Sequence, residues 1–151
     1  MQSEIATAIL IEWIVQGAFT SPDTVGLPKL QWSIMRSIQQ MPADRCDAQR
    51  IAGYLGVPHA TVSRELRKMQ LQGLLRAGRS ETDRRIKLFT LTSSGISASK
   101  RDPMITVAKA IGQLPQVERH EFEQSVREMA LRLFSELEGD GKKTKAGGEP
   151  A

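Results

Sequence analysis

The chain has 151 residues, of which 40% are hydrophobic, 5% aromatic and 25% charged. This length allows one domain with a core of moderate size, and the low aromatic content favours a mostly helical protein. The net charge of +4 is unevenly spread: residues 1–44 are net −2, residues 45–87 net +6 and residues 88–151 net 0. A basic block between such flanks is typical of a phosphate-binding surface, although a solvated basic face without a partner has the same composition.

Several classes of protein are disfavoured at the outset. Cys46 is the only cysteine, so no intrachain disulfide can form and nothing indicates export. The first residues lack the positive region of a signal peptide. The apolar stretch from Ile5 to Phe19 is interrupted by Glu12 and Gln16, which makes it too short and too polar to span a bilayer. We therefore expect a cytoplasmic protein that makes no contact with a membrane.

The first predicted helix covers residues 4–19 and is apolar on most of its circumference. Such a helix must be buried on more than one side, and a small domain offers few such places, so a partner chain is a natural cover. Pro22 and residues 26–28 indicate a loop. A second helix, 28–40, follows from the spacing of Leu30, Ile34 and Ile38.

Two further helices with a tight turn between them are predicted next. Asp47 is a good N-cap for a helix over residues 48–55, and Gly56 supplies the turn. Pro58 suits the first turn of a helix that runs to about Gln72, with Gly73 as its stop. The buried stripe of this fourth helix consists of Val62, Leu66 and Met69.

A hairpin and two more helices complete the predicted elements. Residues 74–76 and 86–91 are expected to be strands, with a polar tip over 77–85. Thr92 caps a fifth helix that Asp102-Pro103 should kink or break. A sixth helix, 116–138, carries an amphipathic seam, and residues 139–151 are expected to be disordered. The seam consists of Phe122, Val126, Met129, Leu133 and Leu137.

This order predicts a mainly α fold with a small β-hairpin wing, that is, a winged helix-turn-helix. In the fourth helix the residues outside the buried stripe are small, hydrogen-bonding or basic, which suits a recognition helix that approaches base edges. An ordinary amphipathic surface helix is the alternative. The candidate DNA-binding residues of this helix are His59, Ala60, Thr61, Ser63, Arg64, Arg67 and Lys68.

The hairpin strengthens the DNA-binding interpretation. Arg79, Arg84 and Arg85 lie on or beside the polar tip, and arginine on a projecting tip fits the narrow minor groove. Asp83 is expected to orient an arginine through a salt bridge, because phosphate would repel its carboxylate. An exposed arginine-rich turn without a partner remains the alternative.

At this point the chain resembles the MarR (multiple antibiotic resistance regulator) family. Residues 83–85 (DRR) followed by 91–95 (LTSSG) resemble the D-x-R and L-T-x-x-G wing signature of that family. Similar matches occur at residues 27–32 (LPKLQW), 61–64 (TVSR), 73–75 (GLL) and 114–118 (LPQVE). The resemblance covers roughly residues 4–138.

The resemblance implies a homodimer in which the first, fifth and sixth helices interlock, so that Ile5, Ile9, Trp13, Phe122, Val126, Met129 and Leu133 become dimerisation residues. It also implies a pseudo-palindromic operator, with recognition helices in successive major grooves and wings in minor grooves. Many such proteins are repressors released by a small aromatic ligand, and others by oxidation of a cysteine. Here the first helix has no cysteine, and Leu114 stands where Ser or Thr usually caps the last helix.

The predicted organisation is an N-terminal dimerisation helix over 1–22, a winged helix-turn-helix over 27–93, dimerisation helices over 94–138 and a disordered tail over 139–151. No cofactor is expected. The isolated histidines and Cys46 disfavour a metal site, and no nucleophile–base pair or phosphate loop indicates an enzyme. Partners expected are double-stranded DNA, a second copy and a small aromatic ligand. A protein-interaction module, an activator without a ligand and an RNA-binding winged helix are the alternatives.

Overall fold

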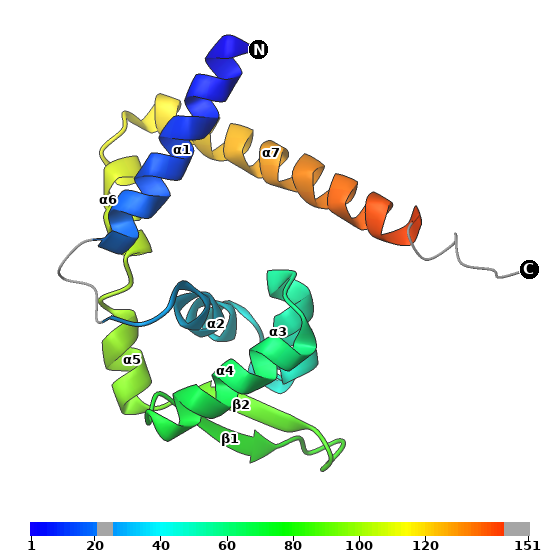
Figure 1. The fold of residues 1–151 in the computed structure, drawn as a ribbon. Helices are drawn as coiled ribbons and strands as arrows, with labels where there is room; N and C mark the ends of the chain where they lie inside the picture. Colours follow the sequence, from blue (N-terminus) through cyan, green and yellow to red (C-terminus); the bar gives the residue numbers. More distant parts are fainter. Residues whose placement is uncertain (21–25, 144–151) are drawn as a thin grey trace, which may run out of the picture. The chain divides into compact units, whose positions relative to one another are not determined.

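A computed structural model describes residues 1–20 and 26–143 of the chain. Its contacts divide the chain into two units, with the division between Val107 and Ala108. The first unit holds most of the elements in the order two helices, helix-turn-helix, hairpin and helix (Figure 1). The mainly α fold with one two-stranded hairpin confirms the predicted fold class. The loop predicted at Pro22 lies outside the described residues.

Local signals place most of the helix ends in the first unit. They are α1 (Gln2–Thr20), α2 (Lys29–Gln40), α3 (Ala48–Leu55) and α4 (His59–Leu71), with a short 3-10 helix, η1 (Ala43–Arg45), that the sequence did not predict. Asp47 caps α3, since its Oδ1 accepts a hydrogen bond from the backbone N–H of Arg50 at 3.0 Å. Gly56 and Gly73 adopt left-handed conformations (φ 63° and 73°) just after α3 and α4.

The core of the first unit lies between α2, α3, α4 and the hairpin. Every residue of the predicted α4 stripe is buried, and so are Trp32 and Ile34 of α2 and Ile51 of α3. Phe89 closes the core from the hairpin side. This packing fixes how α3 and α4 lie against each other, because each helix buries one apolar face against the same cluster.

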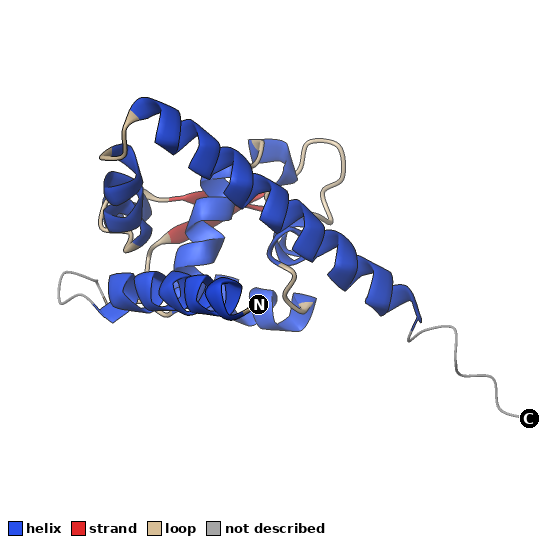
Figure 2. Cartoon of the chain, turned by 90° about the horizontal axis from the view of Figure 1, so that it is seen from above, coloured by secondary structure: helices blue, strands red, loops and turns tan. Residues whose placement is uncertain are grey.

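The hairpin is longer on its first strand than predicted. The two strands, drawn red in Figure 2, are β1 (Leu75–Arg79) and β2 (Lys87–Leu91). They pair in an antiparallel register that runs from Leu75 opposite Leu91 to Arg79 opposite Lys87. The prediction that residues 77–79 belong to the tip was wrong. Ala77 and Gly78 have low intrinsic strand propensity, but their partners Phe89 and Leu88 complete a ladder that propensity alone does not show.

The interruption at Asp102-Pro103 is confirmed, since α5 (Ser93–Ser99) ends before it and α6 (Met104–Gly112) begins after it. Asp102 Oδ1 accepts a hydrogen bond from the N–H of Met104 at 2.9 Å. The same carboxylate binds Arg36 of α2, whose Nη1 lies 2.7 and 2.8 Å from its two oxygens. The start of α6 is therefore tied to α2 by a charged hydrogen bond. In addition, α5 itself packs on α2 through Gln39 and Ser99.

The last helix, α7 (Gln116–Lys143), is longer than the predicted 116–138. Residues 139–143, expected to be disordered, are its final residues, and residues 144–151 lie outside the described part. Glycine lowers helix propensity by about 1 kcal/mol but keeps its N–H donor, so a helix can continue through Gly139 and Gly141. In the described residues, no helix has the length and apolar character needed to cross a membrane.

Two helices carry apolar side chains that the single chain leaves exposed. In α1, Ile5, Ile9 and Trp13 are exposed, with 66% of Trp13 accessible. In α7, Phe122, Val126, Met129 and Leu133 of the predicted seam are exposed, with 54% of Met129 accessible. Isolated apolar residues are normal on a protein surface, but continuous apolar stripes are not. We therefore expect the stripes on these two helices to be buried in an interface.

Candidate nucleic-acid interface

The recognition-helix candidates occupy distinct faces of α4. His59, Ala60, Arg64, Arg67 and Lys68 are exposed, whereas Thr61 and Ser63 are half-buried. His59, Ser63 and Arg67 line a groove that runs between α4 and the hairpin. Arg64 lies on the helix face opposite the buried Val62 and Met69, so its guanidinium is presented outward.

Lys68 differs from the arginines in its partners. Its Nζ lies 2.8 Å from Glu65 Oε1, and Glu65 Oε2 accepts a hydrogen bond from Gln31 Nε2 of α2 at 3.1 Å. These hydrogen bonds, that of Lys68 first, lower the pKa of the Glu65 carboxyl below its usual range. Glu65 therefore stays charged at neutral pH and draws Lys68 toward the α2 side of the helix.

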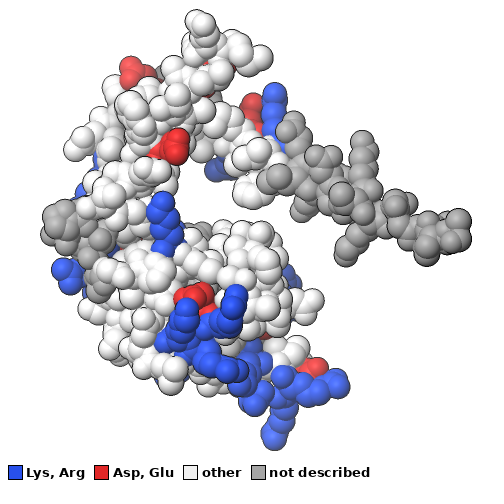
Figure 3. All heavy atoms as spheres, viewed as in Figure 1, with Lys and Arg blue, Asp and Glu red and all other residues white. Residues whose placement is uncertain are grey.

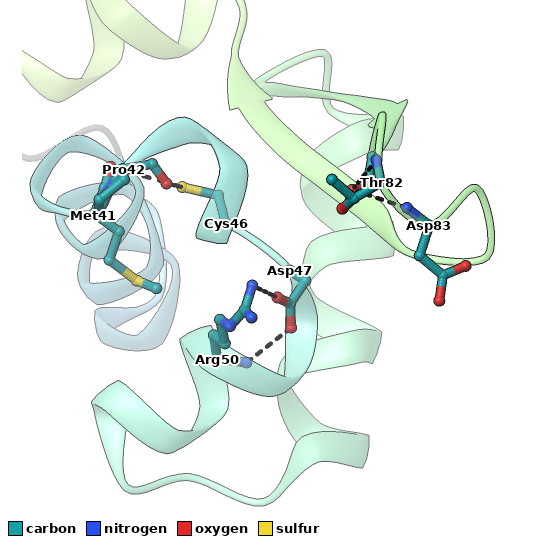
Figure 4. A network of polar contacts seen from close by, with 8 residues as sticks. Met41, Pro42, Cys46, Asp47, Arg50, Thr82 and Asp83 are labelled. Carbon is teal, nitrogen blue, oxygen red and sulfur yellow. Dashed lines mark hydrogen bonds and ion pairs between the residues drawn. The ribbon is translucent and has the colours of Figure 1, made fainter.

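The turn of the hairpin carries the remaining candidates. Arg84 and Arg85 are exposed there, while Arg79 lies at the end of β1 opposite Lys87. The Asp83 carboxylate accepts hydrogen bonds from the backbone N–H of Arg85 at 3.0 Å and from its Nε at 3.2 Å. At the start of the turn, Ser80 Oγ accepts hydrogen bonds from the backbone N–H groups of Thr82 and Asp83 at 3.3 and 3.4 Å (Figure 4). The expected pairing of Asp83 with an arginine is confirmed, and it holds Arg85 on the turn.

We expect Asp83→Ala to weaken duplex binding several-fold, although it removes a negative charge from a surface that would face phosphate. The reason is that Arg85 loses both the turn and the ion pair that orient it. The backbone hydrogen bond from Arg85, and then its side chain, lower the pKa of the Asp83 carboxyl. The turn is therefore held in its ordered conformation at pH values above the usual aspartate pKa. It loses this order only as the pH falls through the lowered pKa of Asp83.

A gel-shift titration at pH 7 measures this effect. Glu81→Ala is the matched control, because it removes the same charge from an exposed position of the same turn and leaves the pairing of Arg85 with Asp83 in place. Tighter binding by Asp83→Ala would show that its charge opposes DNA and that its orienting role is unimportant.

The basic side chains gather on one part of the first unit. In the view of Figure 3, the Lys and Arg atoms are densest over the region of α4 and the hairpin seen in Figure 1. The groove between α4 and the hairpin is lined by Arg67, Arg79, Arg85 and Lys87, with Asp47 as the one acid among its described lining residues. We call it the inner groove. The inner groove is lined by arginines and lies beside α4, so it provides the positive charge and the access that a nucleic-acid backbone requires.

Sequence reasoning missed four basic residues of this surface. Lys87 lies in the inner groove, and Arg45, Arg50 and Arg76 line a second groove along the hairpin. All four fall in the basic segment 45–87, so the charge distribution contained the signal. The positions of these four residues in the grooves depend on the pairing of the strands and on η1. The residue pattern predicted neither of these features.

Cys46 is buried behind this surface. Its Sγ lies 3.4 Å from the carbonyl oxygen of Pro42 (Figure 4). Its own carbonyl accepts a hydrogen bond from Phe89 N–H at 2.9 Å. Burial first, and then Asp44 and Asp47, raise the pKa of the thiol. A protonated, buried thiol is a poor nucleophile, which favours the inert role over the redox role for Cys46. Within the described residues, no group of three His, Cys, Asp or Glu is placed to hold a metal ion.

Helix, turn, recognition helix and hairpin together define a winged helix-turn-helix protein. The family model described as MarR family matches residues 25–86 of this chain. A comparison with curated protein sequences finds no match.

Solved structures agree with the fold over nearly the whole chain. AbsC, a MarR family transcriptional regulator from Streptomyces coelicolor, is 19% identical with a TM-score of 0.70, covering 89% of this chain and 94% of AbsC. Streptococcus pneumoniae FabT in complex with DNA is 21% identical with a TM-score of 0.66, covering 88% and 95%. The S. aureus MepR–DNA complex is 22% identical with a TM-score of 0.65, covering 88% and 98%. At these identities the likeness establishes the fold.

Proposed function

We propose that this protein is a sequence-specific regulator of transcription that binds double-stranded DNA as a homodimer. The observation that carries the proposal is the combination on one surface of an outward arginine on α4, Arg64, with the arginine-lined inner groove and an ordered arginine turn. Two structures of similar fold, those of FabT and MepR, were solved with DNA, which supports the same partner here.

The residues divide into two roles. Arg64, with the small neighbours Ala60 and Thr61, reads base edges in the major groove, since arginine can donate two hydrogen bonds to guanine. His59, Ser63, Arg67 and Lys68 support this contact, and Lys68 acts mainly through its charge because Glu65 holds it. The wing residues Arg79, Arg84 and Arg85 bind in or beside the minor groove, oriented by Asp83. Phosphate contacts supply most of the affinity, and base contacts supply specificity.

The proposed dimer rests on the apolar stripes of α1 and α7. Ile5, Ile9 and Trp13, together with Phe122, Val126, Met129 and Leu133, would be buried by a second copy. A two-fold dimer implies a pseudo-palindromic operator, because each subunit reads one half-site. We further propose a repressor that a small aromatic ligand releases, which is what the family resemblance implies.

Arg64→Ala tests the base-reading role. We expect it to reduce the affinity for a duplex selected by the wild-type protein by about 10- to 100-fold, corresponding to about 1–3 kcal/mol for one bidentate contact. The affinity for random duplex should fall much less. Arg101→Ala, which removes an exposed arginine near the end of α5, is the matched control. Gel-shift titrations on both duplexes measure the ratio.

Equal losses on selected and random DNA would contradict the base-reading role of Arg64. If the wild-type protein selects no sequence and binds no duplex at low salt, the proposed function itself fails. A duplex RNA of the same sequence should not compete, because its major groove is too deep and narrow to admit a helix. Equal competition by that RNA would favour the RNA-binding alternative.

A further inference from the structure

A second basic groove runs along the hairpin. It has a volume of about 750 Å³ and is lined by η1, the start of α3 and both strands. Its charged residues are Arg45, Arg50, Arg76 and Arg79 with Asp44 and Glu81, which leaves it net positive. We call it the outer groove. Arg79 also lines the inner groove, so this one arginine stands between the two.

The strand register explains why the hairpin separates the grooves. Arg76 faces Thr90 and Gly78 faces Leu88 across the ladder, and all four line the outer groove. The alternate pairs are Ala77 with Phe89 and Arg79 with Lys87. Of these residues, Phe89 and Lys87 line the inner groove, Ala77 lines the outer groove and Arg79 lines both. Strand β2 thus presents alternate residues to the two grooves.

The outer groove is prepared to accept a chain of anionic groups. Arg76 Nε donates a hydrogen bond to Thr90 Oγ1 at 3.0 Å, which positions the guanidinium and leaves its other N–H groups available for an anion. Arg50 is similarly held by Asp47 at 3.1 Å (Figure 4). Gly78 has no side chain, and nothing lies within 4 Å of where its Cβ would be, so the floor of the groove between these residues is open.

The geometry of duplex DNA suggests what fills this groove. A minor groove is only about 6 Å wide and is bordered by a sugar-phosphate backbone on each side. The tip of a hairpin that reaches into it therefore has one backbone on each side. The inner groove, between the hairpin and α4, would receive the backbone that separates this minor groove from the major groove occupied by α4. The other backbone would lie on the side of the outer groove, which Arg76 and Arg45 line.

We propose that the outer groove binds the second sugar-phosphate backbone of the minor groove, so that the wing grips both strands of the operator. Arg76 and Arg45 are its phosphate ligands, and Arg79 contacts either strand from between the grooves. This inference rests on the proposed function, which it deepens by naming the strand that these three arginines contact. Arginine suits the task because its planar fork matches the geometry of a phosphate.

The salt dependence of binding tests the proposal. Each lost phosphate contact lowers the slope of log affinity against log salt by about 0.9. We expect the double variant Arg45→Ala, Arg76→Ala to lose nearly two units of slope. Its affinity should fall by the same factor for selected and random duplexes, unlike that of Arg64→Ala. Arg101→Ala is the control for loss of charge, and Arg76→Lys should keep most of the slope because the charge remains.

Phosphate ethylation of a selected duplex gives the strand assignment. Ethylation of the backbone on the side of the outer groove should weaken binding of the wild-type protein but not of the double variant. Ethylation of the backbone next to the major groove that α4 occupies should weaken binding of both proteins. Thermal unfolding shows whether the double variant is folded, which we expect because Arg45 and Arg76 are exposed.

The outcomes separate this inference from the proposed function. If the wild-type protein binds no duplex at low salt, the proposed function fails. If it binds but the folded double variant keeps the full slope and the full ethylation pattern, the outer groove does not contact DNA and this inference alone fails.

Discussion

Met129→Glu is expected to convert the protein to a monomer and to lower its affinity for a selected duplex by at least about 100-fold. Met129 lies in the middle of the α7 seam, and 54% of its surface is exposed in the single chain. In the proposed dimer a carboxylate at this place would be buried without a partner, which costs several kcal/mol. Two half-site contacts on one duplex then become two separate binding events, and the gain from linking them is lost.

Sedimentation equilibrium at micromolar concentration measures the dimer, and gel shifts measure DNA binding. Gln124→Glu is the matched control: it places a carboxylate on the same helix at an exposed position away from the seam. The control should remain dimeric with unchanged affinity. A Met129→Glu protein that stays dimeric would remove α7 from the proposed interface, and a monomer that binds the selected duplex at full affinity would remove the need for a dimer.

Gly95→Ala is expected to destabilise the first unit by about 3 kcal/mol or more, the upper end of what overpacking costs. Gly95 is buried in the first turn of α5, and an added Cβ would lie 2.1 Å from the carbonyl oxygen of Leu74. That carbonyl cannot move freely, because it accepts a hydrogen bond from Thr92 N–H at 3.1 Å. To make room α5 must shift, which breaks the cap between Thr92 Oγ1 and Gly95 N–H.

Urea unfolding followed by circular dichroism measures the loss. Gly53→Ala is the matched control, since Gly53 lies inside α3 with nothing within 4 Å of the added Cβ. An alanine there should stabilise the helix by about 0.5–1 kcal/mol. If Gly95→Ala proved as stable as the wild-type protein, the close approach of α5 to the end of α4 would not be present in solution.

The two glycine substitutions are expected to change the stability in opposite directions, and the sequence alone does not predict this difference. Thr92 was recognised as a helix cap, and Gly95 as part of a family signature, from the order of residues alone. That Gly95 is required by the carbonyl of Leu74 follows only from the packing of α5 on the hairpin. The same holds for Asp102: its proline neighbour predicts the break between α5 and α6, while its bond to Arg36 depends on a helix far away in the chain.

The candidate interface shows the same division. The sequence placed Arg64 and Arg67 on the exposed face of a recognition helix, because the period of the helix separates them from Val62, Leu66 and Met69. It did not show that Glu65 and Gln31 draw Lys68 aside, or that Arg79 lies in a strand opposite Lys87. It also contained the basic segment 45–87 without dividing it into two grooves.

By itself, the sequence determined where the helices other than η1 begin and end, apart from the end of α7, together with the buried face of α4, the position of the wing and the location of the positive charge. These properties depend on caps, turns and periodic patterns within a few residues, so they can be read locally. The tertiary structure alone decided which arginines face which groove, how far the first strand extends and which buried glycine tolerates no side chain. Those properties depend on pairs of residues distant in the chain, and the distances between such pairs are fixed only when the core has packed.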